Sequence, residues 1–280
     1  MGFYGKKELK NLQELVNNMK RYLHLYWTLI QMNFYLLFAY RVNFINSIIA
    51  SIGWGVISIL SMFILTSRNT SIYGWTRNEL LLLSGVYSIV VALFHAFFAR
   101  NFDRFSRIIH LGQLDLILLK PIDAQFNISF TIFHFTALSR LFIALIFSIW
   151  MLSVMHIHFS FLQLIFFIML IFLGVTIFYG VWFLFLTITI WFSNLSNIKD
   201  FLYNFNNLGR YPSEILFKTG NVILLLFLPL TYVASVPVKV LLTKATVSEI
   251  IIMLLFAIVF FVSSRKFWQF ALRFYTSASG

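Results

Sequence analysis

Two histidines stand close enough in the sequence to suggest metal chemistry. His156 and His158 are separated by one residue, and imidazole nitrogens are common metal ligands. Their spacing is poor for a shared helix face, and no carboxylate is nearby in the sequence. The chain has no cysteine, so thiolate ligands are excluded as well. We expect an ordinary interfacial role for both histidines and no metal site.

The chain also lacks a recognisable motif for nucleotide hydrolysis. The phosphate-binding pattern G-x-x-x-x-G-K-[ST] is absent, and every glycine is isolated from such a pattern. A Ser-His-Asp set cannot be assigned without three-dimensional information. The sequence therefore predicts a protein that is not an enzyme and that holds no cofactor of its own.

Composition fixes the class of protein. Of the 280 residues, 60% are hydrophobic and only 11% are charged, which a water-soluble chain of this size cannot cover with polar surface. Several continuous apolar runs exceed the roughly 20 residues needed to cross a bilayer. We therefore predict an all-α, polytopic membrane protein rather than a β-barrel, in which apolar residues would alternate. The net charge of +12 then reflects basic cytoplasmic loops and contact with membrane lipid, not nucleic acid.

Hydropathy divides the chain into six transmembrane helices within one domain, residues 1–280. The predicted spans are 44–66, 79–99, 137–155, 161–192, 221–242 and 249–264. An amphipathic helix at 6–26, with a basic face and an apolar stripe, is expected to lie in the membrane interface. Most lysines and arginines fall on one side when both termini are cytoplasmic, which predicts that orientation in a bacterial cell membrane.

The connection between the second and third spans is unusually elaborate for a simple turn. Phe98, Phe102, Phe105 and Ile109 recur on one helical face, and Arg100, Arg104 and Arg107 form a separate stripe. Gly112 can end this helix with a left-handed cap, and a short apolar stretch from Leu114 then runs to Pro121. Residues 100–122 are therefore predicted to form a cytoplasmic elbow along or below the membrane surface. The pattern alone leaves open whether the elbow binds a partner or only packs on lipid headgroups.

Four stretches together resemble a known family. "GQLDLILLKPI", "RYPSEI", "LPLTYVASVP" and "ALRFYTSASG" occur in the order seen in the membrane (permease) subunits of ABC-2 type ATP-binding-cassette exporters. The resemblance covers most of the chain. It implies that the elbow is the coupling element for a separate ATPase subunit, which binds ATP and Mg²⁺. The residues that it implies for coupling are Arg104, Arg107, Gly112, Leu114 and Asp115.

The same resemblance offers a second layout for the last third of the chain. Hydropathy makes 221–242 the fifth span and leaves "RYPSEI" on the cytoplasmic side, which is the layout we favour. In the wider exporter family, residues 193–210 would instead be the fifth span, and a proline-containing segment would dip into the membrane from outside. Both layouts keep six spans and both termini inside.

The predicted function is an ATP-driven exporter subunit. By the resemblance, two permease subunits, identical or paralogous, form the pathway, and the substrate is a drug, an antimicrobial peptide or a lipid-like molecule. The glycine pairs Gly53/Gly55 and Gly174/Gly180 are weak indicators of a dimer face. The alternatives are an ion-coupled carrier or channel, which the lack of an acidic residue within a span disfavours, and a lipid-modifying enzyme with its site in 193–214.

Overall fold

The computed structural model describes residues 2–67, 71–192, 197–215 and 228–276, and for residues 2–18 it describes only the backbone. Within these residues, five helical stretches are long and apolar enough to cross a membrane. They are α2 (Arg41–Leu65), the run that starts with α3 (Arg77–Phe94), α7 (Ala137–Val154), α8 (Phe161–Thr187) and α13 (Val247–Ala271). The fold class is therefore an all-α polytopic membrane protein, as the sequence predicts. The five stretches begin at or within a few residues of five predicted spans.

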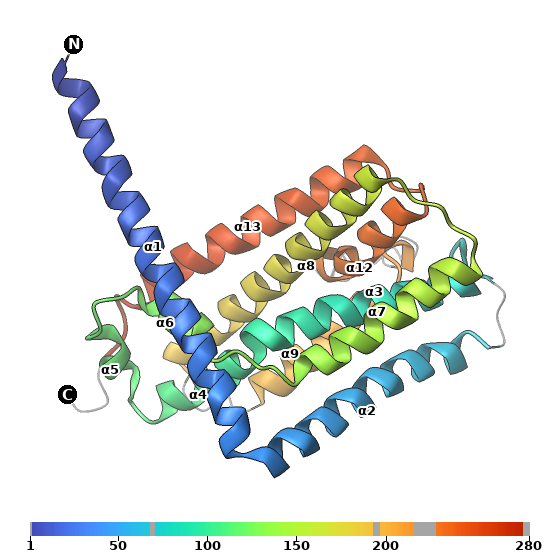
Figure 1. Ribbon diagram of the computed structural model, residues 1–280, viewed down its shortest axis with the longest axis horizontal. Coiled ribbons are helices and arrows are strands. Elements are labelled where there is room, and N and C mark those ends of the chain that lie inside the picture. The colour runs from blue at the N-terminus through green and yellow to red at the C-terminus, as the bar shows by residue number, and fades with distance from the viewer. Residues whose placement is uncertain (1, 68–70, 193–196, 216–227, 277–280) are drawn as a thin grey trace.

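The helices lie side by side in one elongated bundle (Figure 1). α13 packs on α8, α3 packs on α7, and α2 packs mainly on α7. At one end, which we call the hairpin end, α2 and α3 are joined through the two-stranded hairpin β1 (Ser71–Ile72) and β2 (Trp75–Thr76). At the opposite end, which we call the elbow end, α3 leads into the connection to α7.

The helix that begins with α3 is much longer than the predicted span. It continues through a π-helical turn (His95–Ala99) into α4 (Arg100–His110) with helical backbone angles throughout. Its 33-residue apolar stretch, Arg77–Ile109, is about 50 Å long, whereas a bilayer core is about 30 Å thick. The first part of the predicted elbow is therefore continuous with the second span, and its position along or below the membrane surface stays a prediction. No Gly or Pro interrupts residues 86–111, so the helix can extend beyond the apolar core.

The N-terminal helix is also longer than predicted. α1 (Gly2–Ala39) runs on past residue 26 and turns at Tyr40 into α2. Residues 6–52 contain no Gly or Pro, so nothing in this stretch ends the helix where its amphipathic pattern fades. The side chains of the first part of the predicted stripe lie outside the described residues. The interfacial position of α1 stays a prediction.

Two glycines allow the helices of one subunit to approach closely. A Cβ added at Gly180 would lie 2.8 Å from backbone atoms of Phe260 on α13, and one at Gly174 would lie 3.1 Å from the carbonyl oxygen of Val233 on α12 (Leu228–Leu241). This glycine pair therefore serves packing within the subunit rather than a dimer face.

The segment after α8 differs from the favoured layout. α9 (Ile198–Asn206) and the 3₁₀ turn Asn207–Arg210 run from the elbow end, where Tyr203 donates a hydrogen bond to Asp103, towards the hairpin end. There the indole nitrogen of Trp75, in β2, donates to Glu214 over 3.0 Å. Part of the predicted fifth span, 221–227, lies outside the described residues.

The described remainder of that predicted span is the 14-residue helix α12, and this described part is about 21 Å long. Lys239, near its end, forms ion pairs with Glu214 and Glu249. "RYPSEI" therefore lies at the hairpin end, as in the alternative layout and not in the favoured one. Hydropathy missed this because it cannot register ion pairs between distant residues.

Candidate functional site

The predicted elbow forms a compact helix–turn–helix unit at one end of the bundle. We define the elbow as α4, α5 (Leu114–Leu118) and α6 (Ala124–Phe130). α4 ends at Gly112, whose φ of +64° lies in the left-handed region. The amide of Gly112 donates to the carbonyl of Ile109 and that of Gln113 donates to Ile108, which is the Schellman arrangement. The prediction of a left-handed cap at Gly112 is confirmed.

The underside of the elbow is anchored in the aromatic core. Phe102 and Phe105 are fully buried. The ring of Phe102 stacks on Trp182 and that of Phe105 stacks on Phe183, both on α8. Phe105 also meets Trp268 of α13 edge-on, with ring centroids 5.8 Å apart. The apolar stripe read from the sequence therefore joins the elbow rigidly to α8 and α13.

The five predicted coupling residues do not share one surface. Arg104 and Arg107 are exposed and Gly112 forms the turn. Leu114 is fully buried, so direct contact between its side chain and a partner is excluded in this conformation. Asp115 is half-buried beside Tyr275, near the C-terminal end of the chain. Leu114 and Asp115 thus hold the elbow in place, whereas the two arginines face outwards.

Sequence reasoning missed the most exposed part of the elbow. Leu111, Leu116 and Leu119 are 56%, 64% and 82% exposed, and they project from the turn and from α5. We call these three leucines, together with the exposed Arg104 and Arg107 of α4, the elbow tip. A helical count from buried Leu114 and Ile117 would have placed Leu116 on the outer face.

The far arm of the elbow is fixed by an ion pair to the last helix. The carboxylate of Asp123 accepts hydrogen bonds from both terminal nitrogens of Arg265 on α13, over 3.1 and 2.6 Å, and also caps the first turn of α6 at Phe126. Partial burial acts to raise the pKa of Asp123, but these donors outweigh it and hold the pKa below its usual value. Nothing in the sequence pattern connects residues that are this far apart in the chain.

α1 passes over the same arm. Arg21 donates to the carbonyl of Pro121 over 3.0 Å, and the hydroxyl of Tyr22 accepts from the amide of Asp123 over 3.1 Å. The ring of Tyr22 also packs edge-on against Phe126. The elbow is therefore contacted by α1 on one side and by α8 and α13 on the other.

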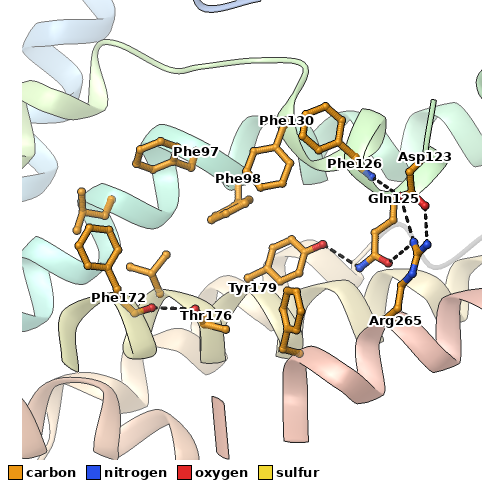
Figure 2. Close-up of a pocket in the computed structure, with 13 residues that line it drawn as sticks. Phe97, Phe98, Asp123, Gln125, Phe126, Phe130, Phe172, Thr176, Tyr179 and Arg265 are labelled. Atoms are coloured by element: carbon orange, nitrogen blue, oxygen red, sulfur yellow. Dashed lines mark hydrogen bonds and ion pairs between the residues drawn. The ribbon is translucent and has the colours of Figure 1, made fainter. Parts of the chain in front are cut away.

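An apolar cavity of about 580 Å³ lies between the elbow arm and the bundle. Figure 2 shows Phe97, Phe98 and Phe130 on one side of it and Phe172 and Tyr179 on the other, with Asp123, Gln125 and Arg265 at one end. The hydroxyl of Tyr179 accepts from the side-chain amide of Gln125 over 2.9 Å. The lining offers binding surface but no nucleophile paired with a base.

The described residues contain no group of three His, Cys, Asp or Glu side chains that could hold a metal ion. His156 and His158 are exposed in the loop between α7 and α8. The elbow is thus a unit at one end of an apolar helical bundle, held to α8 and α13 by aromatic contacts and an ion pair. Five long apolar helices arranged in this way are typical of a multi-pass membrane protein.

The comparison with known families agrees. Residues 52–279 match the family model described as ABC-2 family transporter protein, and the chain belongs to this family. It is therefore a membrane component of an ATP-binding-cassette transport system, in which partnering with ATPase subunits is general, and the resemblance drawn from the sequence is confirmed. No curated protein and no solved structure gives a significant match to the chain.

Proposed function

We propose that this chain is the permease subunit of an ATP-driven exporter in the bacterial cell membrane, with both termini in the cytoplasm and the elbow tip docked on a separate ATPase subunit. The observation that carries the proposal is the contrast within the elbow: its underside is buried and anchored, whereas three leucines of its turn and of the α5 segment and two arginines of α4 are exposed. An exposed apolar patch with a charged border is typical of a protein interface.

The anchoring supplies a path for coupling. A displacement of the tip moves α4, whose phenylalanines are wedged against α8 and α13, and α6, which is ion-paired to α13. ATP bound with Mg²⁺ by the partner can shift the subunit between inward and outward access only if the docked ATPase contacts the two states differently. The elbow is the element on which such a difference can act, and this chain hydrolyses no ATP itself.

We further propose that two such subunits, identical or paralogous, form the pathway between them. Many large apolar side chains of α2 are exposed in the single subunit, among them Ile49, Trp54, Ile57 and Ile64. Such a helix must be covered by lipid or by a second subunit. A drug, an antimicrobial peptide or a lipid-like molecule remains the proposed substrate class.

Co-purification tests the docking. The tagged chain, co-expressed with the ABC ATPase subunits encoded in the same genome, should retain one of them. In the double variants Leu116→Ser/Leu119→Ser and Arg104→Glu/Arg107→Glu, the amount of retained ATPase and the transport rate should each fall at least about tenfold. Leu162→Ser is the matched control, because Leu162 is similarly exposed (61%) but lies at the hairpin end. Wild-type retention in both tip variants, at normal expression, would refute the docking assignment. Transport by the purified chain without ATP would favour the ion-coupled alternative.

A further inference from the structure

Three arginines face α2 at successive levels, and none has a carboxylate within ion-pair distance among the described residues. They are Arg100 on α4, Arg140 on α7 and Arg210 at the end of the 3₁₀ turn that follows α9. A charged group at membrane depth is costly unless it has a partner or a function, and this applies to Arg140 and Arg210, which contact the inner turns of α2. Arg100 lies beside the first turns of α2, at the elbow end. Packing alone does not explain why three arginines without a carboxylate partner lie along α2.

Arg140 lies against the middle of α2. A Cβ added at Gly55 would lie 3.2 Å from the Cγ of Arg140, and the Nε of Arg140 reaches the carbonyl oxygen of Ser51 over 3.5 Å. Ser51 and Gly55 are buried in the third and fourth turns of α2. The guanidinium therefore sits between α7 and α2, whereas a snorkelling side chain would turn away to the headgroups.

Arg210 lies one to two turns further towards the hairpin end. Its terminal nitrogens reach the hydroxyls of Ser58 and Ser61 over 3.5 and 3.4 Å, and its guanidinium lies 5.6 Å from the centre of the Tyr87 ring. Its Nη2 also donates to the side-chain oxygen of Asn207 over 3.2 Å, and among the described residues its Nε is buried without a hydrogen-bond partner. All these partners are neutral, so the charge of the guanidinium is not balanced by them.

Arg100 marks the elbow end of the same row. It lines a cavity of about 260 Å³ together with Phe44 and Ser47 of α2 and with His134. Its Nη2 lies 3.4 Å from the Nε2 of His134, whose other ring nitrogen is buried and unpartnered. Along α2 the facing residues are small or polar, namely Ser47, Ser51, Gly55 and Ser58.

Among the residues that the structure describes, no carboxylate forms an ion pair with Arg140 or Arg210. The acidic side chains that the structure describes lie towards the hairpin end (Glu79, Glu214, Glu249) or towards the elbow end (Asp103, Asp115, Asp123, Asp200). An identical second subunit packed on α2 would bring the same distribution. The charge is therefore better matched by a passing ligand than by a copy of this chain.

We propose that the row of Arg100, Arg140 and Arg210 along α2 is an anion-selective track, and that the transported substrate is an amphiphile with a phosphate or carboxylate headgroup. This inference rests on the proposed transport function and narrows its substrate class. A guanidinium binds such headgroups through two parallel hydrogen bonds, and three of them at successive levels let the headgroup pass from one to the next. The apolar helix surfaces on either side of α2 accommodate the chain of the amphiphile.

A headgroup series tests the track without a variant and without an ATPase. The purified full chain in zwitterionic nanodiscs is titrated with hexadecyl phosphate, hexadecanol and hexadecyltrimethylammonium, and binding is followed by tryptophan fluorescence. Hexadecyl phosphate should bind at least about tenfold more tightly than the neutral or the cationic probe. Equal affinities would overturn the proposal. Inorganic phosphate that binds as tightly as hexadecyl phosphate would also overturn it, because the site would then recognise a free anion.

Variants locate the binding. Arg140→Gln/Arg210→Gln should weaken hexadecyl phosphate about tenfold and leave hexadecanol unchanged, whereas Arg140→Lys/Arg210→Lys should retain most of the affinity. Arg41→Gln is the matched control, since Arg41 is exposed at the start of α2 and outside the row. If the Arg140→Gln/Arg210→Gln variant loses a dimer but still binds hexadecyl phosphate, the arginines serve subunit contact and the proposed track is refuted.

The outcome is separable from that of the docking experiment. If the ATPase co-purifies and drives transport while the headgroup series shows no preference, the exporter assignment stands and the track falls. If the ATPase does not dock, the exporter assignment fails regardless of which probe binds.

Discussion

At the hairpin end of the bundle three long helices begin with a capping box. At the elbow end no described helix begins with one. α3, α8 and α13 each start with a capping box, formed by Thr76 with Glu79, Ser160 with Gln163, and Thr246 with Glu249. Each box satisfies backbone amides that a helix start leaves open. The hairpin end is thus completed by residues of this chain.

The charges at the two ends follow the same contrast. At the hairpin end Lys239 lies between Glu214 and Glu249, and Lys244 pairs with Glu79 over 2.5 Å. At the elbow end the only ion pair among the described residues is Asp123–Arg265, and Arg104, Arg107 and three leucines are exposed. The charges at the hairpin end are therefore paired within the chain, whereas the elbow end leaves exposed the charged and apolar side chains that the proposed docking would use.

The largest expected effect breaks the closed end. Replacing Lys239, which is 8% exposed, with alanine leaves two carboxylates without their cation and should lower the free energy of unfolding by about 3 to 5 kcal/mol. Thermal unfolding followed by tryptophan fluorescence measures the loss. Lys266→Ala, at an exposed lysine of α13, is the control. If Lys239→Ala and Lys266→Ala unfold at the same temperature, the ion pairs of Lys239 do not stabilise the hairpin end. Folded Lys239→Ala protein should still retain the ATPase.

The second effect is at the elbow and should have the opposite signature. Gly112→Val places a β-branched side chain at a φ of +64°, at a cost of about 1 to 2 kcal/mol, and re-aims α5 with its exposed leucines. ATPase activity of the complex with substrate should fall about tenfold, while the unfolding temperature changes by only a few degrees. Gly53→Val is the control, because a Cβ added at Gly53 meets nothing within 4 Å. Unchanged stimulated activity in Gly112→Val would mean that the turn does not transmit coupling.

The sequence predicts the features that depend on local pattern. Continuous apolar runs locate five spans, the phenylalanine stripe identifies the buried face of α4, and Gly112 marks its end, because each is set within one or two helical turns. The pattern could not supply contacts between distant residues. The Asp123–Arg265 pair and the grouping of Lys239 with Glu214 depend on how helices pack, as does the position of "RYPSEI".

The site residues show the same division. Arg104 and Arg107 are exposed as their stripe suggests, whereas Leu114 is buried because α5 turns it towards the bundle. The direction in which a five-residue helix turns depends on the Schellman cap before it and on Pro121 after it. Hydropathy averaged over a window contains no information about the direction in which α5 turns its side chains. The exposed leucines of the elbow tip were missed for this reason.

The smallest expected effect concerns the one ion pair of the elbow end, whose side chains are 41% and 33% exposed. Asp123→Asn should cost less than about 1 kcal/mol at neutral pH, because solvent screens a pair this exposed. The folded-state pKa of Asp123 lies below its ordinary value of 3.8, so the pair stabilises the protein above that pH and loses its effect as the pH falls through the folded-state value. The stability gap between wild type and Asp123→Asn should therefore narrow below 3.8, as measured by thermal unfolding at successive pH values. Asp200→Asn, at an exposed aspartate of α9, is the control for general acid effects. If the difference in stability between wild type and Asp123→Asn does not change with pH, Asp123 acts by capping α6 and not through its charge on Arg265. The side-chain amide of the substituted asparagine can also cap the helix.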